Sequence, residues 1–263
     1  MKKLLDSFLH FMERDFKLSK HHLYALVLLL LIVGFGLRYG YSLMRERQPR
    51  DAKFYIQAVE NINSNDPAWF SKYDYYSPLM PLMAASLYDF GIDAKNALIM
   101  LNIAYTMLWV LVMFFLCRDV FDDDKAGLLG MSFAVFNPYS IRMASQILRE
   151  PLYILIFTLC LWLAVKVVKS KGANLLYPVI IGLLTMLAIY TRFEGFEVIL
   201  FLPLAAIIIL MQYKAKYFRQ VVSNCVIYFL TLLIIIGTLF YAGDSYMGKV
   251  PGKIYGVYVV SKQ

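Results

Sequence analysis

The apolar run LYALVLLLLIVGFGLRYGYSLM, residues 23–44, decides the fold, and Arg38 is the one charged residue in it. About 20 apolar residues with a rise of 1.5 Å each are enough to cross the hydrocarbon core of a bilayer. The run therefore predicts a transmembrane helix. Arg38 lies near its far end, where a long cation either extends to the interface or faces the protein interior.

Later apolar runs predict further spans. They are Ala94–Cys117, Ala126–Ile141, Pro151–Val168, Leu175–Tyr190, Gly195–Gln212 and Val221–Tyr241. The whole chain is 60% hydrophobic with a mean hydropathy of +0.61, whereas soluble domains are roughly 45–50% apolar. We expect an all-α polytopic membrane protein with about seven transmembrane helices.

The connection between the first two predicted spans, residues 45–93, is too long for a tight turn. It opens with RERQPRDAKFYIQAVENI, residues 45–62, in which apolar side chains recur on one face of a short helix: Phe54, Tyr55, Ala58, Val59 and Ile62. A second helix is predicted over Ser77–Phe90, with Ser77 as its cap and Pro78 in its first turn. We expect both helices to lie along the bilayer surface, joined by a turn rich in aromatic residues.

The predicted spans and the long loop form a central module over residues 22–241, and the segments on either side of it have a different pattern. Residues 1–21 alternate apolar and charged side chains at helical spacing, which predicts an amphipathic helix on the cytoplasmic leaflet, and residues 242–263 form an outer tail. With a cytoplasmic amino terminus, the inner loops hold most of the short-loop cations, as the positive-inside rule requires. The net charge of +8 is spread in small groups between apolar runs, so we do not expect a nucleic-acid partner.

This topology brings the residues of chemical interest to the outer face. They are Asp51 in the long loop, Arg142, Arg149 and Glu150 around the next outer turn, and Arg192, Glu194 and Glu197 in the turn after it. Several arginines at an outer membrane surface suit a phosphate group, which a guanidinium binds through two hydrogen bonds. A lipid-linked phosphate reaches such a site sideways from the bilayer.

The order of these segments resembles a known family. One span is followed by an outer loop with an acidic residue and an amphipathic helix, by SPLMPLMAASLYDFG, by FFLCRDVFDDDKAGLLGMSFAVFNPYSIRMASQILREPLYILIF, and by the outer turn TRFEG. This order is similar to that of the membrane-embedded GT-C glycosyltransferases of the protein-mannosyltransferase and aminoarabinose-transferase type. The resemblance covers residues 22 to 212. Members of that family carry further spans after this module.

The resemblance implies transfer of a sugar from a polyprenyl-phosphate donor to an acceptor on the outer face of the cell (inner) membrane, with inversion. Asp51 matches the family's catalytic acid and Glu150 its second acidic position. For the donor phosphate the candidates are Arg50, Lys53, Arg142, Arg149 and Arg192, with Glu194 and Tyr55 as supporting residues. Three roles stay open for Glu150: to orient an arginine, to assist the acceptor, or to bind a divalent cation together with Asp51.

A second hypothesis is a non-catalytic seven-span subunit that keeps this fold and binds a lipid or docks a second membrane chain, which would supply the further spans. In this alternative Asp51 caps the helix that begins beside it, and the arginines contact lipid headgroups. Asp122, Asp123 and Asp124 are interpreted as a solvated turn on the cytoplasmic side.

Overall fold

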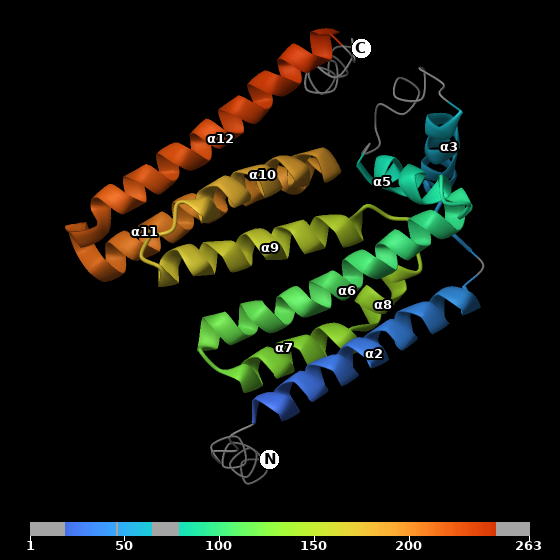
Figure 1. Cartoon of the computed structure of the whole chain (residues 1–263), viewed down its shortest axis with the longest axis horizontal. Coiled ribbons are helices and arrows are strands. Elements are labelled where there is room, and N and C mark those ends of the chain that lie inside the picture. Colours follow the sequence, from blue (N-terminus) through green and yellow to red (C-terminus); the bar gives the residue numbers. More distant parts are fainter. Residues whose placement is uncertain (1–18, 46, 65–78, 246–263) are drawn as a thin grey trace.

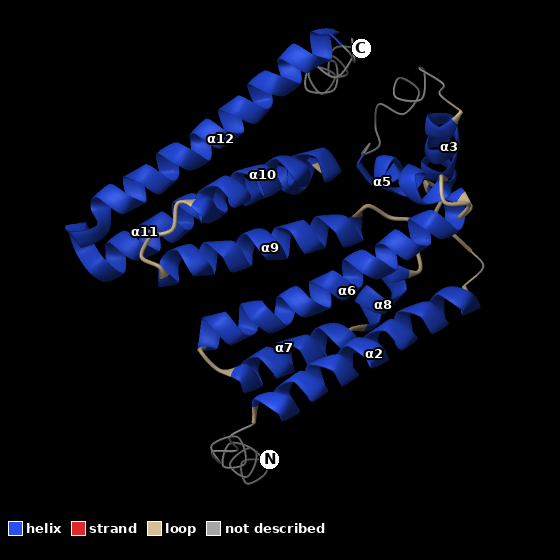
Figure 2. Ribbon diagram, viewed as in Figure 1, coloured by secondary structure: helices blue, strands red, loops and turns tan. Residues whose placement is uncertain are grey.

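The computed structural model describes residues 19–45, 47–64 and 79–245. The described chain consists of helices joined by loops, with no strand, so the predicted all-α polytopic membrane fold is confirmed (Figure 2). The predicted surface helix over residues 1–21 lies almost entirely outside the described residues. The same holds for the aromatic turn, for the Ser77 cap and for the tail from residue 246 onward.

Long helices lie side by side, and the chain reverses at two opposite ends of the layer (Figure 1). The elements, in chain order, are α2 (Lys20–Met44), α3 (Ala52–Asn63), α5 (Leu79–Tyr88), α6 (Ala94–Phe121), α7 (Asp124–Phe136), α8 (Pro138–Ala144), α9 (Glu150–Lys169), α10 (Leu176–Thr191), η1 (Phe193–Leu200), α11 (Phe201–Tyr213), η2 (Lys214–Tyr217) and α12 (Phe218–Ser245). Helices α3, α5 and α8 gather at the end where α2 stops and α9 starts (Figure 1).

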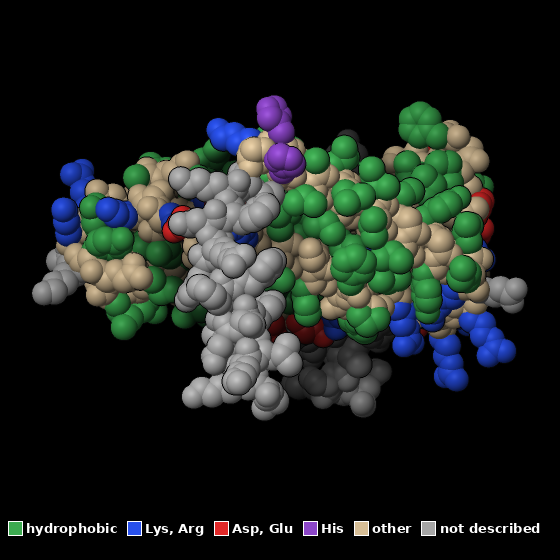
Figure 3. Space-filling model, turned by 90° about the horizontal axis from the view of Figure 1, so that it is seen from below, with side chains coloured by type: hydrophobic (Ala, Val, Ile, Leu, Met, Phe, Trp, Pro, Cys, Tyr) green, Lys and Arg blue, Asp and Glu red, His purple; other side chains and the backbone are tan. Residues whose placement is uncertain are grey.

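Five segments of the described chain are long and apolar enough to cross a bilayer. They are Lys20–Met44, Ala94–Phe121, Glu150–Lys169, Glu194–Tyr213 and Phe218–Thr238. The predicted span Leu175–Tyr190 corresponds to α10, a shorter apolar helix of 16 residues. Broad apolar surfaces remain exposed, over α2 in particular, and in Figure 3 most Lys and Arg side chains lie toward the ends of the molecule. Such a surface suits contact with lipid chains.

The predicted span Ala126–Ile141 is wrong as a single helix, because α7 ends at Phe136 and the separate helix α8 begins at Pro138. Proline has no N–H, so it cannot donate to the carbonyl of Ala134, four residues earlier. The side chain of Asn137 accepts hydrogen bonds from the N–H groups of Tyr139 and Ser140 instead, and so starts the new helix. The break leaves carbonyls at the end of α7 that need other donors.

Arg38 supplies those donors. Its side chain is fully buried and donates to the carbonyls of Ala134 (3.1 Å) and Val135 (3.3 Å) and to Ser140 Oγ (2.8 Å). Of the two positions predicted for this cation, it therefore takes the interior one. Because α2 and the α7–α8 break are joined through these bonds, Arg38 fixes the end of α2 against α8.

Helix α3 confirms the predicted helical segment, and protein contacts bury its apolar face. Its apolar face is covered by other helices of the chain. Tyr55 and Val59 pack against Met80 of α5, Leu98 of α6 and Ile147. The α3–α5 pair thus covers the start of α6 with protein contacts, and it brings the segment that contains Asp51 to the end of the layer where α9 begins.

At the opposite end of the helix layer, where α6 and α9 end and α7 begins, a second set of charged side chains joins the helices. Asp119, near the end of α6, accepts a hydrogen bond from Trp162 Nε1 (2.6 Å) and forms ion pairs with Lys166 (2.7 Å) and Arg118 (3.5 Å). Asp123 caps α7 by accepting from the N–H of Lys125. These contacts join α6 to α9 and turn the chain into α7.

Candidate functional site

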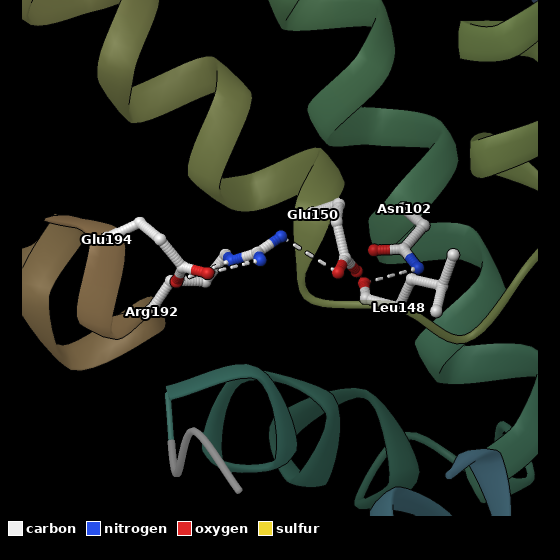
Figure 4. A network of polar contacts seen from close by, with 5 residues as sticks. All are labelled: Asn102, Leu148, Glu150, Arg192 and Glu194. Carbon is white, nitrogen blue, oxygen red and sulfur yellow. Dashed lines mark hydrogen bonds and ion pairs between the residues drawn. The ribbon is translucent and has the colours of Figure 1, made fainter. Parts of the chain in front are cut away.

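The structure assembles a charged network where α9 starts and α10 ends. Glu150 is the first residue of α9, followed by Pro151, and a carboxylate in the first turn is favoured by the positive end of the helix dipole. Arg192 NH1 donates to Glu150 Oε1 at 2.9 Å, and the Arg192 Nε and NH2 groups donate to the two oxygens of Glu194 at 3.1 and 2.8 Å. Figure 4 shows Glu150 between Arg192 and Asn102.

Gly195 allows this network to form. At Arg192 the chain leaves α10 in an extended conformation and then folds back as η1 against the last turn of α10. A Cβ atom at position 195 would lie 2.3 Å from the Ala188 carbonyl carbon and 2.4 Å from the Ile189 nitrogen, which are backbone atoms that cannot turn aside. Only glycine permits this approach, which places Glu194 beside Arg192.

Tyr153 adds two contacts from the same face of α9, one turn after Glu150. Its hydroxyl donates to the backbone carbonyl of Glu194 at 3.2 Å, and the Arg192 guanidinium lies 5.6 Å from its ring centroid. The hydrogen bond to Glu194, with the charge of Glu150, raises the pKa of Arg192. Arg192 therefore remains a cation at physiological pH and holds the two carboxylates in fixed positions.

The loop before Glu150 is held by two amides that each contact its backbone. Gln48 donates to the carbonyl of Ser145 (3.1 Å) and accepts from the N–H of Ile147 (3.0 Å). Asn102, fully buried in α6, donates through Nδ2 to the carbonyls of Gln146 (2.5 Å) and Leu148 (3.0 Å). Because Gln48 lies three residues before Asp51, the long loop is connected directly to the segment that positions Glu150.

Two buried oxygens in this network accept no hydrogen bond from any described residue. They are Glu150 Oε2 and Asn102 Oδ1. The orientation of the Asn102 amide follows from its Nδ2, which contacts two carbonyls and so cannot be exchanged with the oxygen. A buried acceptor without a donor costs about 1–3 kcal/mol, so a saturated structural ion pair is a poor description of Glu150.

Asp51 lies elsewhere at the same end of the molecule. It stands at the start of α3 with an exposed side chain, makes no side-chain capping bond, and takes part in no ion pair among the described residues. Arg50 and Lys53 are also exposed, and the Lys53 ammonium lies 4.9 Å from the Phe54 ring centroid. Tyr55 is buried in the contact between α3 and its neighbours.

The three arginines of the outer turns do not converge on one point. Arg192 is engaged by the two glutamates. Arg149 is half-buried just before α9, close enough for its charge to act on Glu194. Arg142 is exposed at the end of α8 and lines a pocket with Tyr41, Met44 and Arg45. The three arginines thus divide between two places, and Arg50 and Lys53 lie apart from both, at the start of α3.

Sequence reasoning missed four residues that build the site: Gln48, Asn102, Tyr153 and Gly195. Only Asn102 had a clear signal, since an amide inside an apolar span is a functional candidate. The other three depend on which segments meet in space. Within the part of the chain that the structure describes, no group of three or more His, Cys, Asp or Glu side chains could hold a metal ion.

Comparison with known proteins adds no family: no protein-family model matches the chain, and no curated protein sequence matches it.

Proposed function

We propose that this protein is a membrane glycosyltransferase that moves a sugar from a polyprenyl-phosphate donor to an acceptor at the end of the helix layer where α9 begins. The order of segments in the sequence supports the reaction class, through its resemblance to the GT-C glycosyltransferases. The proposal rests on the hydrogen bonding of the Glu150 carboxylate. Arg192 holds one of its oxygens, while the other has no donor among the described residues.

A general base must be held in place and must keep an oxygen free for the proton it takes. Glu150 meets both conditions better than Asp51, whose exposed side chain has no partner to orient it. We therefore propose Glu150 as the base, with Asp51 as the competing candidate that the family resemblance favours. Arg192 is a positioning residue, because its guanidinium group already forms ion pairs with Glu150 and Glu194.

In this mechanism the acceptor hydroxyl or amine attacks the anomeric carbon, and its proton passes to Glu150 Oε2. The bond between that carbon and the phosphate oxygen breaks as the new bond forms, and polyprenyl phosphate leaves with the electron pair. Cations near the leaving phosphate stabilise the charge that develops there. Arg149, which makes no ion pair among the described residues, is close enough for its charge to act on Glu194 and is our candidate for this role. A divalent cation remains a further candidate for this role.

We place this end of the molecule outside the cytoplasm, in the cell (inner) membrane. At the opposite end, Lys166 and Lys169 lie in the last turn of α9, Lys171 lies just after it, and Arg219 lies in the first turn of α12. This group of cations favours a cytoplasmic position for that end. The donor lipid then enters from the outer leaflet, next to the apolar surface of the helices.

The experiment compares four forms of the purified chain in nanodiscs: wild type, E150Q, D51N and E197Q. Each receives polyprenyl-phosphate mannose or polyprenyl-phosphate aminoarabinose together with a membrane extract as acceptor, and the release of polyprenyl phosphate is measured. We expect E150Q to lose about 10²–10⁴-fold in rate. E197Q changes an exposed carboxylate of η1; it is the matched control and should keep the wild-type rate.

The outcomes separate the hypotheses. A large loss in D51N with an unchanged E150Q assigns the base to Asp51 and refutes our choice of Glu150. A folded wild-type chain that releases no polyprenyl phosphate from either donor contradicts the enzyme and favours the non-catalytic subunit. In that case a second membrane chain should be recovered with the protein from native membranes.

A further inference from the structure

A second polar feature, outside the Glu150 network, lies where α2 ends against α8. A pocket of about 280 Å³ is lined by Tyr41, Met44, Arg45 and Arg142. Arg45 is half-buried, and its Nε donates to the backbone carbonyl of Arg47 at 3.1 Å, whereas its terminal N–H groups have no partner among the described residues. Among the described residues the side chain of Arg142 has no hydrogen-bond or ion-pair partner.

Two guanidinium groups on one small pocket repel each other unless an anion lies between them. Neither forms an ion pair with a carboxylate of the described chain. Arginine forks match the oxygens of a phosphate group, to which each donates two parallel hydrogen bonds. The chemistry of the pocket therefore favours a phosphate over a neutral polar ligand.

The position of the pocket indicates where that phosphate comes from. Helix α2 has 25 residues, about 37 Å at 1.5 Å per residue, so it exceeds the roughly 30 Å hydrocarbon core. Lys20, His21 and His22 lie at its other end, and its last turn reaches the headgroup level on this side. Arg45 follows that last turn.

An apolar path leads along α2 to the pocket. Leu37, Tyr41 and Met44 are spaced by four and three residues, so they share one face of the helix. Their side chains are 38%, 39% and 83% exposed, which leaves a continuous apolar stripe on the outside of the molecule. A hydrocarbon chain can lie along this stripe while its headgroup reaches the two arginines.

We infer that the Arg45–Arg142 pocket binds the phosphate headgroup of a membrane lipid whose chain runs along Leu37, Tyr41 and Met44. The source is a lipid and not free phosphate, because the pocket opens beside lipid-facing side chains. This inference goes beyond the proposed sugar transfer and does not require it, since it concerns binding alone. If the polyprenyl-phosphate donor is the lipid bound, the pocket is where its phosphate first docks.

The test is native mass spectrometry of the purified chain in a neutral detergent, titrated separately with polyprenyl phosphate, phosphatidylglycerol, the uncharged polyprenol and inorganic phosphate. We expect both lipid phosphates, or polyprenyl phosphate alone, to bind the wild type, and the R45Q/R142Q variant to bind at least about tenfold more weakly. R47Q is the matched control. It removes an exposed cation two residues from Arg45 that does not line the pocket, and binding should stay within about twofold of wild type.

Three results would overturn the inference. If R47Q weakens binding as much as the double variant, the attraction is diffuse surface charge and not a built site. If polyprenol binds as tightly as its phosphate, the arginines do not recognise the headgroup. If inorganic phosphate competes at the same concentration as the lipids, the apolar stripe contributes nothing. R45K/R142K keeps both charges but lacks the guanidinium groups, so it should bind with an intermediate affinity. Because it keeps both cations, it serves as a control for a folding defect in the glutamine variant.

Discussion

Gly195 provides the sharpest test of the site geometry, through the substitution Gly195→Ala. The added Cβ would lie 2.3 Å from the Ala188 carbonyl carbon, whereas ordinary van der Waals contact starts at 3.4 Å, so η1 must move away from α10 by about 1 Å (3.4 − 2.3 = 1.1 Å). Packing strain of this kind costs about 1–3 kcal/mol. The shift also stretches the Tyr153–Glu194 and Arg192–Glu150 hydrogen bonds, each worth about 1 kcal/mol.

We therefore expect G195A to be destabilised by about 3 kcal/mol and to melt about 6–12 °C below the wild type, measured by thermal unfolding in detergent. Because a misplacement of about 1 Å can reduce catalysis by about 10²-fold, the release of polyprenyl phosphate should fall by a similar factor. Gly36→Ala is the matched control. A Cβ there meets nothing within 4 Å, and alanine is the better helix residue.

The G36A protein should consequently melt at or above the wild-type temperature and keep its activity. If G195A melts like G36A, then η1 does not pack against α10 as described. The reasoning that connects Gly195 to the position of Glu194 would then be wrong.

Three other substitutions test contacts that hold the frame of the site. Arg38→Lys keeps the charge but loses the guanidinium group that donates to the Ala134 carbonyl at the end of α7 and to Ser140, so we expect a lower melting temperature than for Arg47→Lys. Equal melting temperatures would argue against the capping role of Arg38. Asn102→Ala removes the donor to the Gln146 and Leu148 carbonyls, so amide hydrogen exchange in the loop before Glu150 should become faster, while exchange in α12 is unchanged. A loop that stays protected from exchange would contradict the assigned contacts. Lys166→Met removes the Lys166–Asp119 ion pair and leaves Asp119 with its 3.5 Å pair to Arg118, so we expect the free energy of unfolding to fall by about 1–2 kcal/mol. Binding of lipid phosphate should be unchanged, because the lost ion pair lies at the other end of the helix layer from the Arg45–Arg142 pocket. Weaker lipid binding in this variant would show that the two ends are coupled.

Hydrophobic periodicity alone determined the class of the fold and the position of its long helices. The run from Leu23 to Met44 is α2, and the apolar face predicted for residues 54–62 belongs to α3. These results follow because transfer of apolar side chains out of water is a local property of the sequence, as is the helical spacing that groups them on one face. The same property placed Glu150 at the start of α9, since Pro151 and the apolar run after it mark a helix start.

Tertiary structure alone decided which polar groups meet. No spacing in the sequence connects Gln48 to Ile147, Asn102 to Leu148 or Arg192 to Glu150, because these residues lie on segments that only the packing of helices brings together. The sequence prediction missed the break of the span at Pro138, and no local pattern showed that Arg38 would supply the donors that the break requires. The place of Asp51 in the long loop favoured it as the catalytic acid, yet its side chain makes no contact among the described residues that would orient it. Glu150 is instead fixed by Arg192, which lies 42 residues away in the sequence. Hydrogen bonds depend on distance and angle, and both are set only when the chain has folded.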